Sequence, residues 1–130
     1  MNPESRLFID GELVPAASGR TYANISPVTE EVIGHVADAG TEDMERAIAA
    51  ARRAFDTTDW STNHAFRLQC LRQLRDALVA VKDEFKQQIA AETGSPLGIC
   101  GAGGPQCEVP IGFIDYTLET LPAFRWSRDI

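Results

Sequence analysis

Three cysteines are the first candidates for chemistry in this chain, because a thiolate can act as a nucleophile or bind a metal. Cys70 lies beside the apolar stripe of a helical pattern, which favours a buried structural thiol. Cys100 and Cys107 lie in or next to a glycine-rich stretch with no histidine nearby in sequence. A nucleophilic cysteine needs exposure and an electropositive setting, so no catalytic cysteine is predicted. With two histidines and no C-x-x-C pair, zinc binding is not expected either.

Acidic and histidine side chains are the next candidates, for general acid–base catalysis. Glu108, Asp115 and Glu119 have spacings that can place them along one side of a helix. An acid–base pair also needs burial and a cleft, so a solvated acidic face is the favoured interpretation. His35 and His64 have no partner motif and are predicted to be surface or hydrogen-bonded residues.

A glycine-rich run raises the question of nucleotide binding. Gly101 and Gly103 supply G-x-G, but Gln106 stands where the third glycine of the dinucleotide fingerprint is required. The run also follows a predicted helix rather than a strand. We therefore expect residues 98–105 to form a glycine-rich connector, and no cofactor-binding residue is predicted from this motif.

Two short extended pairs precede these residues. Residues 7–14 form two apolar runs around Asp10-Gly11, a dipeptide that favours a type I′ hairpin. Residues 22–25 and 31–37 are the arms of a second, hairpin-like pair, connected through Ser26-Pro27.

Three helices follow the extended pairs. Thr41 is the expected N-cap of the first helix, and the second runs from about residue 64 to 92 and ends at Gly94. Helical periodicity marks apolar stripes on both, formed by Met44, Ala47, Ile48, Ala51, Ala54 and Phe55 on the first and by Leu68, Leu71, Leu74, Leu78, Val81, Phe85 and Ile89 on the second. A third helix is predicted over residues 108–121. Because the chain holds no complete βαβ unit, these elements alone read as a single α+β piece.

Length and charge limit the possible partners. The 130 residues are 44% hydrophobic and carry a formal net charge of −7, which indicates one globular unit and argues against nucleic acid or an anionic membrane as partner. No apolar run approaches a membrane span, and the first six residues do not resemble a signal peptide. With its odd, unclustered thiols the chain is expected in the cytoplasm.

Several motifs of the sequence also resemble those of a known protein family, and this resemblance suggests a function that the patterns above do not. The pieces F-I-D-G-E, S-G-R-T, N-I-S-P-V-T-E-E-V-I-G, A-I-A-A-A-R-R-A-F-D and Trp60-Ser61 occur in an order that resembles the opening of the aldehyde dehydrogenase superfamily. The likeness continues to E-T-G-S-P at residues 92–96 and through Gln106-Cys107-Glu108-Val109-Pro110, and covers nearly the whole chain. It implies an α/β fold, of which residues 1–130 are the N-terminal part of the nucleotide-binding domain.

The resemblance implies oxidation of an aldehyde to an acid with NAD or NADP. In the family a cysteine thiolate attacks the carbonyl, a glutamate activates water, and an asparagine stabilises the oxyanion. In the family the asparagine follows a Pro-Trp pair, and a cofactor-binding lysine comes soon after it. None of these parts is expected here, since no Pro-Trp occurs, no asparagine follows Asn63 and no lysine follows Lys86. The catalytic and cofactor-binding residues are thus predicted to be absent from this chain.

One family site is expected in part. Many members hold a monovalent cation, Na⁺ or K⁺, through backbone carbonyls in the segment that matches Asn24-Ile25 and a carboxylate near the position of Glu108. The alternative for these residues is simple structural packing.

Three functional interpretations remain open. The chain is a truncated dehydrogenase that is inactive alone, half of a split dehydrogenase whose remainder is a second polypeptide, or a non-enzymatic protein-interaction module. The aldehyde, the choice between NAD and NADP and the oligomeric state do not follow from the sequence. In isolation the stripes at residues 48–55 and 68–89 are expected to stay partly uncovered.

Overall fold

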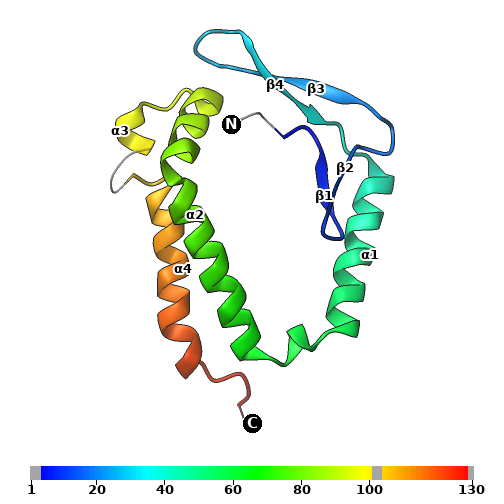
Figure 1. The fold of residues 1–130 in the computed structure, drawn as a ribbon, viewed down its shortest axis with the longest axis vertical. Coiled ribbons are helices and arrows are strands. Elements are labelled where there is room, and N and C mark those ends of the chain that lie inside the picture. Colours follow the sequence, from blue (N-terminus) through cyan, green and yellow to red (C-terminus); the bar gives the residue numbers. More distant parts are fainter. Residues whose placement is uncertain (1–3, 101–103, 129–130) are drawn as a thin grey trace. The chain divides into compact units, whose positions relative to one another are not determined.

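The computed structural model describes residues 4–100 and 104–128, which belong to two compact units (Figure 1). The first unit contains the chain up to Thr62 together with Ala91–Gly94, and the second contains Asn63–Ala90 and the chain from Ser95 onward. Three short segments lie outside the described residues: residues 1–3, residues 101–103 and residues 129–130. They include the start of the N-terminal segment that was not expected to be a signal peptide, and Gly101 and Gly103 of the G-x-G motif.

The first extended pair is a β-hairpin, as predicted. Strands β1 (Leu7–Ile9) and β2 (Glu12–Val14) are antiparallel, with Phe8 opposite Leu13. Asp10 and Gly11 both have positive φ, 57° and 82°, which a type I′ turn requires of its two central residues.

The second extended pair is also antiparallel. Strand β3 (Thr21–Ile25) pairs with β4 (Val32–Ala37), and the register shifts between Asn24 and Ile25. Asn24 lies opposite Gly34 and Ile25 opposite Val32, so β4 carries one extra residue at this β-bulge. The buried Ser26 organises the connection, because its Oγ accepts the N–H groups of Val28 and Thr29, both at 3.3 Å.

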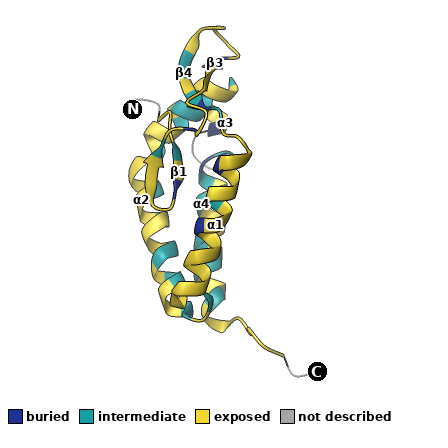
Figure 2. Ribbon diagram, turned by 90° about the vertical axis from the view of Figure 1, so that its right-hand side faces the viewer, coloured by how far each residue is buried: buried dark blue, intermediate teal, exposed yellow. Residues whose placement is uncertain are grey.

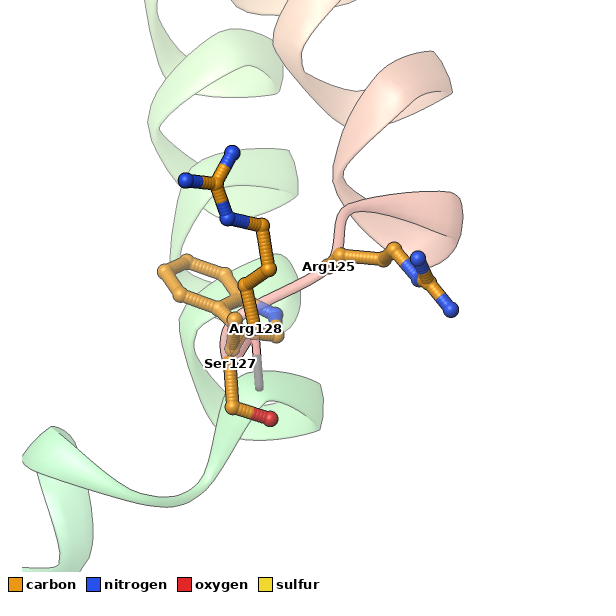
Figure 3. Close-up of a pocket in the computed structure, with 4 residues that line it drawn as sticks. Arg125, Ser127 and Arg128 are labelled. Carbon is orange, nitrogen blue, oxygen red and sulfur yellow. The ribbon is translucent and has the colours of Figure 1, made fainter. Parts of the chain in front are cut away.

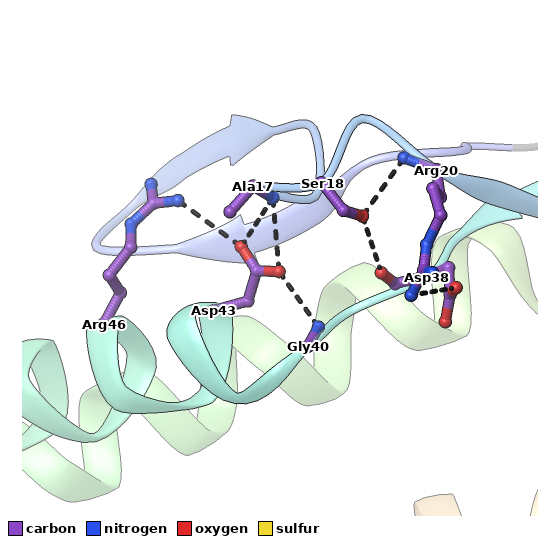
Figure 4. Close-up of polar contacts among 7 residues, drawn as sticks. All are labelled: Ala17, Ser18, Arg20, Asp38, Gly40, Asp43 and Arg46. Atoms are coloured by element: carbon purple, nitrogen blue, oxygen red, sulfur yellow. Dashed lines mark hydrogen bonds and ion pairs between the residues drawn. The ribbon is translucent and has the colours of Figure 1, made fainter.

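Helix α1 (Thr41–Thr57) begins one residue earlier than predicted, because Gly40 rather than Thr41 is its N-cap. The capping group is the carboxylate of Asp43, which accepts the Gly40 N–H at 3.1 Å (Figure 4). The same carboxylate accepts the Ala17 N–H and lies 3.4 Å from Nη1 of Arg46. Asp43 is only 2% exposed. Its hydrogen bond with the Ala17 N–H connects the start of α1 to the loop after β2.

Helix α2 (His64–Thr93) follows a 3₁₀ turn at Asp59–Ser61 and matches the predicted long helix. It ends at Gly94, whose φ of 71° is typical of the residue after a helix C-terminus. A Cβ at Gly94 would lie 3.2 Å from side-chain atoms of both Pro27 and Val28. The β3–β4 connection therefore packs closely on this end of α2.

The remaining elements are helical. A short helix, α3 (Leu97–Cys100), occupies the start of the predicted 98–105 connector, because backbone N–H groups of Ile99 and Cys100 bond the Pro96 carbonyl. Helix α4 (Glu108–Thr120) confirms the third predicted helix, with Pro110 in its first turn. A 3₁₀ turn at Leu121–Ala123 follows it.

Burial is sparse along the predicted stripes (Figure 2). Helix α1 buries Asp43 and Ala50, and α2 buries no described residue fully. The prediction that the stripes stay partly uncovered is confirmed, since large apolar side chains on them are exposed, namely Met44, Ile48, Phe55, Leu74, Val81 and Phe85. No helix of the described residues is long and apolar enough to cross a membrane.

Candidate functional site

The acidic side of α4 is the main charged site of the second unit. Glu108 and Asp115 lie on one side of the helix, as the spacing predicted, but they are not a freely solvated face. Arg75 of α2 donates from Nε to Oδ1 of Asp115 at 3.0 Å. Nζ of Lys86, also on α2, donates to Oε1 of Glu108 at 2.8 Å, and Nζ of Lys82 lies 3.8 Å from it. Ion pairs thus join α2 and α4, which lie side by side in Figure 1.

Glu108 is held by two favourable interactions. It is the first residue of α4, where a negative charge is stabilised by the positive end of the helix dipole. Its side chain is 28% exposed, and that of Lys86 only 14%. The hydrogen bond to Glu108 raises the pKa of Lys86 above its ordinary value of 10.5. The Glu108 carboxylate therefore already forms an ion pair with the ammonium group of Lys86.

The other two residues of the expected cation site lie at the β-bulge. Asn24 is half-buried and Ile25 is 55% exposed. The bulge interrupts the regular ladder beside the two residues whose carbonyls the resemblance assigns to a cation. Asn24 and Ile25 belong to the first unit and Glu108 to the second, so the three-residue site stays a prediction. Among the described residues there is no group of three or more His, Cys, Asp or Glu side chains arranged for a metal ion.

The cysteines differ from the sequence-based expectation. Cys70, predicted to be buried, is only half-buried on α2. Cys100 and Cys107 are buried, with 0% and 3% exposure. The Cys100 thiol donates to Oε1 of Gln106, with 3.2 Å between sulfur and oxygen. Nε2 of Gln106 in turn donates to Oγ of Ser95. Burial withholds these two thiols from any substrate.

Neither histidine forms part of an acid–base pair among the described residues. His35 is exposed on β4. The ring of His64 stacks on Trp126 with centroids 4.2 Å apart, and its Nδ1 is buried without a hydrogen-bond partner in the structure. Trp126 also lines a hollow of about 410 Å³ with Arg125, Ser127 and Arg128 (Figure 3). In Figure 3 the two guanidinium groups point in different directions, so they do not form a convergent anion site.

Several contacts of these side chains had no signal in the sequence. Arg75, Lys82 and Lys86 have the helical spacing of solvated charges, and only the placement of α4 beside α2 makes them ion-pair partners. The position of Trp126 on His64 likewise depends on the chain returning to the start of α2. None of these contacts supplies a nucleophile or a hydride acceptor.

Comparison with known proteins identifies the protein family. The family profile described as "Aldehyde dehydrogenase family" matches residues 13–121. The chain is 37% identical over 107 residues to the mitochondrial benzaldehyde dehydrogenase of Antirrhinum majus, covering 82% of this chain and 19% of the relative. It is 32% identical over 126 residues to the aminoacetaldehyde dehydrogenase of Pseudomonas aeruginosa, covering 96% of this chain and 23% of that protein.

Solved structures agree with the sequence comparison. Aldehyde dehydrogenase C of Pseudomonas syringae, solved with NAD⁺ and octanal, matches with a TM-score of 0.88 and 28% identity over 98% of this chain and 26% of its own. The gamma-glutamyl-gamma-aminobutyraldehyde dehydrogenase of Burkholderia cenocepacia also matches at 0.88, with 30% identity over 95% of this chain and 25% of its own. The chain belongs to the aldehyde dehydrogenase family, and its fold is an α/β portion of that fold. It spans about a fifth of the length of the curated relatives it matches.

Proposed function

We propose that this chain is the N-terminal part of the nucleotide-binding domain of an NAD(P)-dependent aldehyde dehydrogenase. The observation that carries the proposal is the match of nearly the whole chain to dehydrogenases solved with NAD⁺. A relative named as an NADP/NAD-dependent aldehyde dehydrogenase, from Escherichia coli, is 36% identical over 95 residues. The reaction of the whole protein is then the oxidation of an aldehyde to a carboxylic acid, with NAD(P) as the hydride acceptor.

On this proposal the 130 residues act as a scaffold and do not catalyse the oxidation alone. Acyl transfer to an enzyme needs an accessible thiolate beside a base and oxyanion donors. Cys100 and Cys107 are buried, and the half-buried Cys70 lies on α2 with no histidine among its neighbours in the helix. The partner required for activity is the remaining part of a dehydrogenase, in the same chain or as a second polypeptide.

Activity measurements separate the possibilities. The purified chain is incubated with an aliphatic or aromatic aldehyde and NAD⁺ or NADP⁺, and reduced cofactor is followed by absorbance. We expect no turnover from the chain alone and turnover when it is fused to the remaining part of a relative. Turnover by the isolated chain would refute the scaffold proposal. A split enzyme further predicts that a separately encoded remainder co-purifies with the chain.

The exposed apolar stripes support a second candidate, a protein-interaction module without enzymatic function. Exposed apolar patches of more than a few hundred Å² commonly mark interaction sites. This candidate predicts a monomer or homo-oligomer that melts cooperatively without the rest of a dehydrogenase. Aggregation or unfolding of the purified chain would count against it.

We further propose a monovalent-cation site in the assembled protein and a cytoplasmic location for it. A site formed by Asn24, Ile25 and Glu108 requires that Glu108 exchange Lys86 for Na⁺ or K⁺, which both bind oxygen ligands. Replacing K⁺ with a bulky organic cation is then expected to lower the stability of the assembled protein. Three free thiols support a cytoplasmic location, because oxidising compartments favour paired cysteines.

A further inference from the structure

The turn of the β1–β2 hairpin holds Asp10-Gly11, the one aspartate–glycine pair in the 130 residues. Every other aspartate and asparagine of the sequence precedes a residue that carries a Cβ. The backbone nitrogen that follows an aspartate can attack its side-chain carboxyl group, and a Cβ on the following residue obstructs that approach. Asp10 is therefore the aspartate whose carboxyl group is most accessible to the next backbone nitrogen.

The turn is open to solvent and has free space around it. The Asp10 side chain is 63% exposed, and a Cβ placed on Gly11 would have no atom of a described, non-adjacent residue within 4 Å. A hollow of about 310 Å³ adjoins the turn, and the small side chains of Ala47, Ala51 and Ala54 form part of its wall. Water and a rearranged turn therefore both have room at Asp10-Gly11.

Strand pairing and an ion pair hold the turn in its native form. Three cross-strand residue pairs join β1 to β2, and a two-stranded hairpin of this length is only marginally stable in water. Nη2 of Arg53 donates to Oδ2 of Asp10 at 2.6 Å, which connects the turn to α1 across 43 residues of chain. Arg53 thus binds the same carboxylate that the Gly11 nitrogen can attack.

We propose that Asp10-Gly11 is a site of spontaneous isomerisation to isoaspartate, and that the ion pair with Arg53 restrains the reaction. The Asp10 carboxylate takes up a proton, the Gly11 nitrogen bonds to Cγ, and one Cγ–O bond breaks. The oxygen leaves as water with that proton and the proton of the amide nitrogen, so a neutral succinimide remains. A water molecule then opens the ring. Its attack on the main-chain carbonyl carbon of residue 10 yields isoaspartate, and its attack on Cγ restores aspartate.

The role of Arg53 follows from charge. The succinimide is neutral, so the ion pair stabilises the reactant of the first step and not its product. The pair also holds Oδ2 of Asp10 at α1, whereas ring closure requires the carboxyl group to turn toward the Gly11 nitrogen. An exposed ion pair contributes little free energy, so its loss is expected to accelerate isomerisation by about two- to fivefold.

Isoaspartate does not fit the native turn. The chain then continues through Cβ and Cγ, which adds one backbone atom and leaves a carboxylate directly on Cα. A type I′ turn needs two standard residues with positive φ to align its strands. Isomerisation is therefore expected to break the pairing of Ile9 with Glu12 and to expose Ile9, which is 9% exposed in the native hairpin.

The first test locates the modification. The purified chain and a synthetic peptide of residues 5–15 are incubated at neutral pH, and isoaspartate is assigned by electron-transfer fragmentation in a mass spectrometer. We expect isoaspartate at residue 10 of the folded chain, formed more slowly than in the peptide, which lacks Arg53. Asp10→Glu is the negative control, because its longer side chain closes the corresponding ring far more slowly. No isoaspartate at residue 10 after the peptide has reached its final level would overturn the proposal, as would an unchanged signal in Asp10→Glu.

The second test isolates the ion pair. Arg53→Gln removes it and is expected to accelerate isomerisation by about two- to fivefold, whereas Arg53→Lys keeps the charge and stays close to the parent. Arg52→Gln is the matched control, because Arg52 pairs with Asp56 on its own helix. Added salt, which screens an exposed pair, is expected to accelerate the reaction in the parent chain and not in Arg53→Gln, so the test does not depend on the variant folding. Equal rates for Arg53→Gln and Arg52→Gln, with no effect of salt on the parent, would show that Arg53 does not restrain the site.

The third test measures the opening of the hairpin. The isoaspartyl chain is separated by chromatography, and its amide hydrogen exchange is compared with that of the unmodified chain by mass spectrometry. Residues 7–14 are expected to lose protection, while residues 21–37, the second hairpin of the same unit, keep theirs. Unchanged protection over residues 7–14 would overturn the proposed opening.

Discussion

The carboxylate of Asp43 in α1 accepts the backbone N–H of Ala17, at 3.0 and 3.2 Å from its two oxygens, across 26 residues of chain (Figure 4). The same group accepts the N–H of Gly40 and so caps the helix that carries it. One buried side chain thereby joins the loop after β2, the helix start and, through Arg46, the next turn of α1.

Substitution of Asp43 is expected to destabilise the first unit. Asp43→Ala leaves the N–H groups of Ala17 and Gly40 without their partner, which lowers the free energy of unfolding by about 2–3 kcal/mol. Urea denaturation followed by circular dichroism, and by tryptophan fluorescence in a Trp126→Phe background in which Trp60 is the remaining tryptophan, measures the effect. Glu42→Ala, an exposed change in the same helical turn, is the matched control and changes stability by a few tenths of a kcal/mol. Equal effects of the two substitutions would contradict the capping role.

Gly94 is expected to tolerate no side chain. Its φ of 71° is unfavourable for other residues, and a Cβ would lie 3.2 Å from both Pro27 and Val28. Gly94→Ala therefore lowers the free energy of unfolding by about 1–2 kcal/mol or more. Gly112→Ala, inside α4 with open space at its Cβ, is expected to raise it by about 0.5–1 kcal/mol. Thermal melts of both variants provide the comparison, and a stabilised Gly94→Ala protein would show that the close contact is absent in solution.

The Lys86–Glu108 pair predicts an alkaline loss of stability in the second unit. Because the pKa of Lys86 is raised in the folded state, its contribution is fully present below the ordinary value of 10.5 and is lost as the pH rises through the higher folded value. Glu108→Gln reduces this dependence, because Oδ1 of Asp83 still lies 3.6 Å from Nζ of Lys86, and it weakens the second unit at neutral pH. Unfolding midpoints of both proteins, measured from pH 8 to about pH 12, isolate the effect, because all other alkaline changes are common to both proteins. Parallel pH profiles would contradict the pairing.

The three cysteines are expected to differ in reactivity. Cys70 is half-buried and is expected to react with iodoacetamide in the native protein, whereas Cys100 and Cys107 are buried and react only on unfolding. Mass spectrometry of peptides after timed alkylation, without and with urea, measures the three rates. Native labelling of Cys107 as fast as Cys70 would mean that the contact of its thiol with the Lys82 carbonyl opens readily.

Much of the fold follows from local patterns. Asp10-Gly11 predicts the hairpin because the turn needs two residues with positive φ, and both have it. Gly94 predicts the end of α2 for the same reason. The N-cap of α1 was predicted at Thr41 because threonine is a common capping residue. The prediction is wrong by one residue because the capping oxygen comes from Asp43, inside the helix.

The candidate site was less predictable than the elements. The spacing of Glu108 and Asp115 places them on one side of α4, and the structure confirms it. Their partners Lys86 and Arg75 come from α2, 22 and 40 residues away, and nothing in the local sequence pairs them. The same holds for burial, since Cys100 becomes fully enclosed although it follows an exposed part of α3.

The sequence by itself determined the order of the four strands and of the helices α1, α2 and α4, the turns that need glycine and the membership in a family, but not the short helix α3. These depend on backbone preferences and on side-chain periodicity, which act over a few residues. Only the tertiary structure decided that α1 buries Asp43 and Ala50 and leaves Ile48 exposed. Periodicity places apolar side chains on one side of a helix, but burial depends on which distant segment packs there.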